Sequence, residues 1–252
     1  MGVSPLTLFN AAGSALRAQQ ASLDLVANNL ANAATPGFKA ARADLVEMRS
    51  TGQTPDGTPV EGSVWLAGTT RDFGQGVLTW TGNPLDMAID GSGFFRVSLA
   101  DGQWAYTRDG SFRRDRDGRL VTAGGLYVDT DAQFRPEDRT IYVNADGSVW
   151  AQPDGGQPVQ RGSISLYQFP NSEGLEAVGD NLFVETPASG GTQAGTPGQG
   201  FGNLVAGARE GSNVELSREV ANMLLAQRSY SLSLRVLQAL DTMQRQANDL
   251  AR

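Results

Sequence analysis

The spacing of apolar residues differs between the two ends of the chain and its middle. Near the start, apolar side chains recur every seven residues, at Phe9, Leu16, Leu23 and Leu30. Near the end, the same spacing joins Leu216, Met223, Tyr230 and Leu237. Seven residues make about two turns of α-helix, so each series lies along one helix face. We therefore predict a long helix at each end, and each helix needs a partner helix.

The predicted C-terminal helix is apolar on more than one side. Val220 and Leu234 flank its first line, and a second line runs through Leu225, Leu232, Val236, Ala239, Met243, Ala247 and Leu250. A Ser-x-x-Glu capping box at Ser212 and Glu215 marks the predicted start of this helix. Since a helix that is apolar on two faces has more than one neighbour, we expect the N-terminal helix on one face and other subunits on the second.

Between the two helical stretches the pattern changes to short apolar runs separated by turns. Seven Asp-Gly dipeptides fall here, at Asp56, Asp90, Asp101, Asp109, Asp117, Asp146 and Asp154. Asp-Gly between short apolar runs is a strong hairpin signal. The sequence thus predicts an α+β fold, in which long N- and C-terminal helices pack as a coiled coil and enclose a central antiparallel all-β domain. The predicted segments are an N-terminal helix (1–35), an extended linker or hairpin (36–72), the β domain (73–205) and the C-terminal helix (206–252).

Composition removes several classes of function. The 252 residues include no Cys and no His, which excludes thiol nucleophiles, His general bases and the common zinc sites. The net charge of −7 argues against nucleic-acid binding, which needs a basic face. No stretch approaches the roughly 20 apolar residues of a membrane span, and residues 1–10 do not resemble a cleavable signal peptide. We predict no catalytic residues, no metal, no cofactor and no small-molecule substrate.

Three blocks of sequence resemble those of the bacterial flagellar rod and hook proteins. The first contains Ala18-Gln19-Gln20, residues 23–32 and Thr35-Pro36-Gly37-Phe38-Lys39. The second runs from Gly82 to Phe95 and continues through residues 106–112 and 120–122, and the third runs from Glu210 to Met223 and includes residues 227–230 and 241–243. The blocks cover nearly the whole chain in the family order. Residues 174–183 and the overall length are most similar to distal rod subunits.

The resemblance implies a structural protein that self-assembles into the helical tube of the flagellar rod and transmits torque from motor to hook. It also implies a location in the basal body, in a rod that spans the periplasm. The implied route is the flagellar type III export apparatus, without a cleaved signal peptide. The implied partners are copies of the same chain, adjacent rod subunits, the hook protein and the surrounding basal-body rings. Two alternatives stay open: a proximal rod or hook-like subunit, and a helical-ended β-domain binding module.

We expect the assembly interface to lie on both terminal helices. On the N-terminal helix it comprises Phe9, Leu16, Leu23, Val26, Asn28, Asn29, Leu30 and Asn32. On the C-terminal helix it comprises Leu216, Val220, Met223, Leu225, Gln227, Tyr230, Leu232, Leu234, Val236, Leu237 and Met243. The three Asn residues fit either a fraying helix end or amide pairs across a helix interface. The Arg-rich run from Arg108 to Arg119 fits either a contact with a neighbour or anionic surface, or a solvated hairpin.

Overall fold

The structure is a computed structural model that describes residues 5–48 and 63–250, with the side chains of residues 5–11, 47–48, 63–65, 244, 247–248 and 250 left out. The chain forms two compact units. Unit 1 contains Met1–Ala31, Ala41–Arg71 and Glu215–Arg252, as far as these are described. Unit 2 contains Asn32–Ala40 and Asp72–Val214. The chain therefore passes between the units four times.

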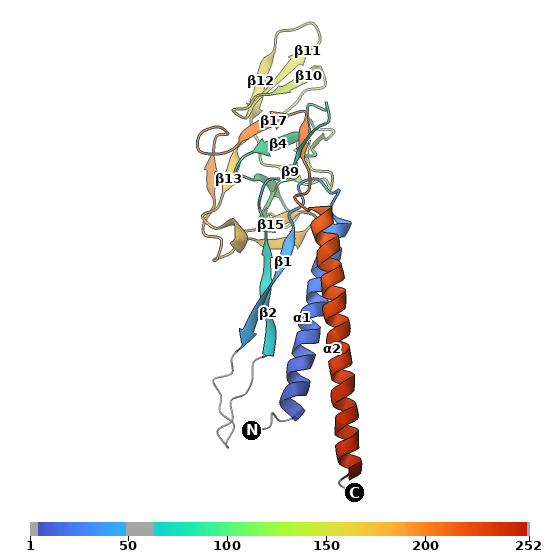
Figure 1. Cartoon of the computed structure of the whole chain (residues 1–252). Helices are drawn as coiled ribbons and strands as arrows, with labels where there is room; N and C mark the ends of the chain where they lie inside the picture. Colours follow the sequence, from blue (N-terminus) through green and yellow to red (C-terminus); the bar gives the residue numbers. More distant parts are fainter. Residues whose placement is uncertain (1–4, 49–62, 251–252) are drawn as a thin grey trace. The chain divides into compact units, whose positions relative to one another are not determined.

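Unit 1 consists of two long helices and a β-hairpin. Helix α1 spans Pro5–Ala31 and helix α2 spans Leu216–Leu250. Strands β1 (Ala41–Met48) and β2 (Ser63–Arg71) pair antiparallel, with Ala41 opposite Arg71. Helix α1 contacts α2 and both strands, and Figure 1 shows the two helices side by side in opposite directions. Both terminal helices predicted from the heptad spacing are present.

The predicted start of the C-terminal helix is wrong. Helix α2 begins at Leu216, and the Ser212 hydroxyl accepts a hydrogen bond from the Val214 N–H instead of capping a helix. The reason is Asn213, whose side chain binds the backbone of Ala40 and Asp72 in unit 2. Residues 212–214 are therefore held in an extended path, and the helix starts only after it.

Unit 2 is built from short strands and one 3₁₀ turn, η1 (Ser172–Gly174). The strands are β3 (Leu78–Trp80), β4 (Met87–Asp90), β5 (Phe95–Ser98), β6 (Trp104–Thr107), β7 (Arg113–Arg114), β8 (Leu120–Val121), β9 (Tyr127–Val128), β10 (Asp138–Val143), β11 (Ser148–Pro153), β12 (Val159–Ser163), β13 (Leu166–Gln168), β14 (Glu176–Gly179), β15 (Leu182–Val184), β16 (Gln193–Gly195), β17 (Asn203–Ala206) and β18 (Ala208–Glu210). Their described ladders are antiparallel.

The largest sheet has seven strands in the order β14-β15-β6-β5-β9-β8-β7. A three-stranded sheet, β10-β11-β12, and three two-stranded ladders, β13-β16, β17-β4 and β18-β3, complete unit 2. Four of the predicted Asp-Gly turns join neighbouring strands, with positive φ at Gly102, Gly118, Gly147 and Gly155. Asp56 lies outside the described residues.

Unit 2 has its own hydrophobic core. Its larger cluster includes Met87, Ile89, Phe95, Val97 and Leu166, none of which is exposed. A second cluster is aromatic, with Phe94, Tyr106, Tyr167, Phe169 and Phe183 around the half-buried Phe73. The fold class is therefore α+β, with a β-rich unit between two helices in sequence. Among the described helices, neither is both long and apolar enough to cross a membrane.

Candidate functional site

Helix α2 turns different kinds of side chain toward α1 and away from it. No Gly or Pro interrupts its 35 residues, so nothing local breaks the helix. Its more buried side carries the small or polar Glu219, Ala226, Ser229 and Ser233, together with the half-buried Met223, Tyr230, Leu237 and Leu240. The large aliphatic side chains lie mostly on the other side. The helix therefore leaves most of its large aliphatic side chains exposed and partly buries the others.

The exposed side chains form a line that we call the α2 stripe, consisting of Leu225, Leu232, Val236 and Met243. At 100° per residue these four positions fall within about 40° around the helix axis. Leu225, Leu232 and Met243 are 61%, 60% and 62% exposed. An aliphatic side chain left in water forgoes roughly 1.5–3 kcal/mol of burial free energy. The α2 stripe is thus a continuous apolar surface that this chain leaves uncovered in its described part.

The predicted heptad line on α2 divides between the two sides. Met223, Tyr230 and Leu237 are half-buried, whereas Leu216, Val220 and Leu234 are exposed. A straight helix drifts about 20° per heptad, so later members of a strict seven-residue series rotate to another face. Gln227 is exposed and its carbonyl accepts a hydrogen bond from the Ser231 hydroxyl at 2.9 Å.

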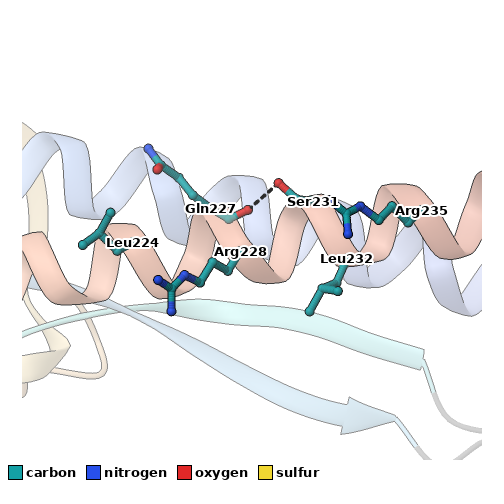
Figure 2. A pocket seen from close by; sticks show the side chains of 6 residues that line it. All are labelled: Leu224, Gln227, Arg228, Ser231, Leu232 and Arg235. Atoms are coloured by element: carbon teal, nitrogen blue, oxygen red, sulfur yellow. Dashed lines mark hydrogen bonds between the residues drawn. The ribbon is translucent and has the colours of Figure 1, made fainter.

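An open hollow lies on the exposed side of α2. Figure 2 shows that its six lining side chains come from this one helix, and they are Leu224, Gln227, Arg228, Ser231, Leu232 and Arg235. The small Ser231 lies between longer neighbours, which leaves space beside it. Leu232 belongs to both the hollow and the α2 stripe, so the stripe borders a surface that also offers guanidinium groups.

The predicted residues of α1 are mostly turned into unit 1. Leu16, Leu23 and Leu30 are half-buried and Val26 is buried, while the side chain of Phe9 lies outside the description. The described exposed positions of α1 are polar or small, and they are Arg17, Gln20, Asp24, Ala27, Asn28 and Ala31. From residue 12 onward, where its side chains are described, helix α1 therefore presents no apolar stripe that matches the one on α2.

The three Asn residues have separate environments. Asn29 is buried, and its amide donates to the Ala41 carbonyl at 2.8 Å and accepts from the Ala41 N–H at 2.9 Å. It thus fixes the start of β1 against α1. Asn28 is exposed. Asn32 follows the helix, and its carbonyl accepts the N–H of Thr35 at 3.0 Å in the turn that ends α1.

A buried ionic cluster lies in unit 2, and sequence reasoning assigned it no role. The side chains of Lys39 and Glu210 are fully buried, with Nζ and Oε1 2.6 Å apart. Lys39 also donates to the Gly74 carbonyl at 2.7 Å, and Glu210 Oε1 accepts the Gly76 N–H at 2.8 Å. Arg108 lies 3.4 Å from the other carboxylate oxygen of Glu210. Lys39 is the chain's single lysine. That rarity was the sequence feature that could have marked Lys39 as a residue with a special role.

Burial and ion pairing shift the pKa of Lys39 in opposite directions. Burial lowers the pKa of its ammonium group, and the adjacent Glu210 carboxylate partly offsets this effect. Burial likewise lowers the pKa of the Arg108 guanidinium. Lys39 and Glu210 each have an opposite charge and a backbone group within hydrogen-bond distance, and Arg108 faces the second carboxylate oxygen of Glu210. The cluster therefore ties four chain segments together.

Asn213 forms further hydrogen bonds close to the cluster, at the points where the chain leaves unit 2. Its amide nitrogen donates to the carbonyls of Asp72 at 2.7 Å and Gly74 at 3.2 Å, and its oxygen accepts from the Ala40 N–H at 2.8 Å. Its own N–H donates to the Phe38 carbonyl. Ala40, Asp72 and Asn213 each stand within two residues of a passage to unit 1.

Among the described residues, no group of three acidic side chains could hold a metal ion.

Three family models match the chain in sequence order. They are "Flagella basal body rod protein" over residues 9–39, "Flagellar hook protein FlgE/F/G D1 domain" over 88–151 and "Flagellar basal body rod FlgEFG protein C-terminal" over 205–250. The first contains most of α1, the third contains all of α2, and the second lies inside unit 2.

Similarity to individual proteins extends over nearly the full length. The flagellar basal-body rod protein FlgG of Borreliella burgdorferi is 38% identical over 257 residues, covering 96% of this chain and 97% of that protein. FlgG of Bacillus subtilis is 33% identical over 264 residues, covering 95% and 97%. The flagellar hook protein FlgE of Salmonella typhimurium is only 24% identical, over 397 residues. The chain therefore belongs to the bacterial flagellar basal-body rod and hook protein family, and within it is a structural subunit of the distal rod.

Proposed function

We propose that this chain polymerises through the α2 stripe into the helical tube of the distal rod, which carries torque from motor to hook. The observation that supports this function is the uncovered line of Leu225, Leu232, Val236 and Met243. Exposed apolar surface of this extent marks an interaction site. Its occupant is the helical unit of a second copy of the chain.

The two sides of α2 favour an open polymer over a closed dimer. One side of α2 faces α1 of the same chain, and the other presents the α2 stripe, while the exposed side of α1 is polar or small. The stripe therefore meets a different surface on the neighbouring copy. Contacts between unlike surfaces generate rings or open helical filaments, and a tube is a helical filament.

Within the tube, α1 and α2 pack as a coiled coil. The half-buried Leu16, Leu23 and Leu30 of α1 and Met223, Tyr230 and Leu237 of α2 supply the seam within one copy. The small residues Ala226, Ser229 and Ser233 allow the two helices to approach closely. The exposed residues Leu216, Val220 and Leu234 add to the surface that neighbouring copies cover.

The chain is a component of the flagellar basal body and contacts adjacent rod and hook subunits. We extend this to a rod that spans the periplasm inside the basal-body rings, reached unfolded through the flagellar type III export apparatus. The absence of Cys supports this route, because an unfolded chain without thiols cannot form disulfide cross-links during passage.

The proposal is tested with Leu232→Asp in the purified full-length chain. A charge in the α2 stripe must be desolvated without a partner when a neighbouring copy covers it, so we expect no tubes in electron micrographs at concentrations where the wild type forms them. Gln238→Asp is the matched control, since it places the same charge at an exposed polar position and should leave assembly intact. Tubes of normal diameter from the Leu232→Asp chain would refute the α2 stripe as the assembly surface.

A further inference from the structure

The two ends of the seven-stranded sheet in unit 2 carry opposite charge. At one end, Arg113 and Arg114 form β7, and Arg116 and Arg119 lie in the hairpin that leads to β8. All four side chains are exposed. We call these four residues the basic edge.

The acidic residues inside this hairpin do not neutralise the basic edge. Asp115 Oδ1 accepts the backbone N–H groups of Asp117 and Arg119 at 2.9 and 2.7 Å, so that carboxylate shapes the turn. Within the described residues, none of the four basic-edge guanidinium groups has a carboxylate within 4.0 Å. Arg119 lies instead over the ring of Tyr127. Arg114 Nη1 donates to the Arg135 backbone carbonyl at 3.4 Å. Neither contact cancels a positive charge, so all four cationic groups can still pair with an acidic partner.

The opposite end of the sheet is acidic. Glu173 in η1, Glu176 in β14, Asp180 in the β14–β15 turn and Glu185 after β15 are all exposed. We call these four residues the acidic edge. Residues 162–208 contain no Lys or Arg, so nothing nearby in sequence offsets their charge. Every residue of β14 is exposed, including Val178 at 50%.

Within the described residues, no ion pair joins the two edges of one chain. Strands β14 and β7 are the first and last of the sheet, and five strands lie between them. Each edge also leaves one side of its outermost strand without a partner strand in the described sheet. The complementary surface for either edge is therefore the other edge of a second copy.

We propose that the basic edge of one copy docks against the acidic edge of the next, as a lateral contact between β-rich units. This contact rests on the proposed polymer and adds to it a second interface, independent of the α2 stripe. Since the two surfaces differ, the contact is head-to-tail and repeats from copy to copy, as an open filament or a ring. Charge complementarity of this kind selects the partner and its register.

Charge reversal tests the pairing directly. Arg113→Glu/Arg114→Glu/Arg116→Glu makes both edges acidic, and Glu173→Arg/Glu176→Arg/Glu185→Arg makes both basic. Three exposed ion pairs together correspond to about a tenfold change in association. We therefore expect each full-length variant alone to need about tenfold more protein to associate, and an equimolar mixture to associate as the wild type does. Sedimentation and light scattering at low salt measure this, and a mixture that fails to recover would overturn the proposal.

Cysteine cross-linking supplies a second test, because the chain contains no Cys of its own. Arg114→Cys/Glu176→Cys places one thiol at each edge. A disulfide needs Cα atoms within about 7 Å, and a bridge within one chain would give a monomer and no ladder. Under copper-phenanthroline oxidation we expect a ladder of covalent oligomers. Arg139→Cys/Glu176→Cys is the matched control, with its first thiol on β10, and should give dimers at most.

The outcomes separate this contact from the proposed function. Wild-type tubes without a ladder, and without recovery in the charge-reversed mixture, would overturn the edge contact and leave the α2 stripe standing. Recovery and a ladder from chains that never form tubes would support the edge contact and count against the tube. Wild-type binding to phosphatidylglycerol vesicles through the basic edge, with no recovery in the mixture, would assign that edge to an anionic surface instead.

Discussion

The two units of this chain treat their apolar and charged residues in opposite ways. Unit 2 buries Phe95, Met87 and Leu166 in its own core and buries even the charges of Lys39 and Glu210. Unit 1 leaves Leu225 and Leu232 of α2 more than half exposed. Unit 2 therefore has its own hydrophobic core, as an independent domain does. Unit 1 has an exposed apolar surface that is left for other molecules to cover. Stability should depend on the first and assembly on the second.

The largest expected effect is on the core of unit 2. Phe95→Ala removes a fully buried ring that packs edge-on against Phe112 at 5.0 Å between centroids. We expect a loss of about 3–5 kcal/mol in the free energy of unfolding, from lost burial and the cavity left behind. Urea denaturation followed by circular dichroism measures it. Tyr127→Ala, at a partly exposed ring, should cost below about 1 kcal/mol, and equal losses would contradict a self-sufficient core.

A smaller loss is expected from the ionic cluster. Lys39→Met leaves the buried Glu210 carboxylate with the Gly76 N–H and the more distant Arg108. We expect a loss of about 3 kcal/mol in the free energy of unfolding, because one partner of a buried pair is gone. Lys39→Met/Glu210→Gln should recover part of it.

The exposed Arg42, with a long contact to Asp44 at 3.7 Å, supplies the control for Lys39. Arg42→Met should change the free energy of unfolding by no more than about 0.5 kcal/mol. If Lys39→Met changed the free energy of unfolding as little as Arg42→Met does, the cluster would not stabilise unit 2.

The smallest effect on stability is expected from the α2 stripe. Leu232→Asp should change the free energy of unfolding by less than about 0.5 kcal/mol in dilute protein, because the side chain is already in water. Ala226→Asp, on the buried side of the same helix, should cost roughly 2 kcal/mol or more. Thermal unfolding of both variants, at protein concentrations too low for assembly, measures the difference between the two losses in stability. A large loss from Leu232→Asp would mean that the stripe is covered within the chain.

Local patterns predicted much of the fold because they depend on neighbours in sequence. Seven-residue spacing marked both helices, and Asp-Gly marked turns such as those at Gly102 and Gly147. Contacts between distant segments left no such trace. Lys39 and Glu210 are 171 positions apart, and Asn213 delays α2 by binding backbone that only the folded unit 2 presents. The second apolar line on α2 did predict exposed positions, but its covering partner remains a prediction.

The burial of Lys39 also determines how the chain reacts with acylating reagents. Lys39 is the single lysine, and its side chain is fully buried, so no side-chain amine is offered at the surface. Acylation there requires unit 2 to open around residues 37–39, and its rate follows that local opening equilibrium. The acylation rate of Lys39 therefore reports the local opening of unit 2. An enzyme that modifies surface lysines would find no substrate side chain until this unit opens.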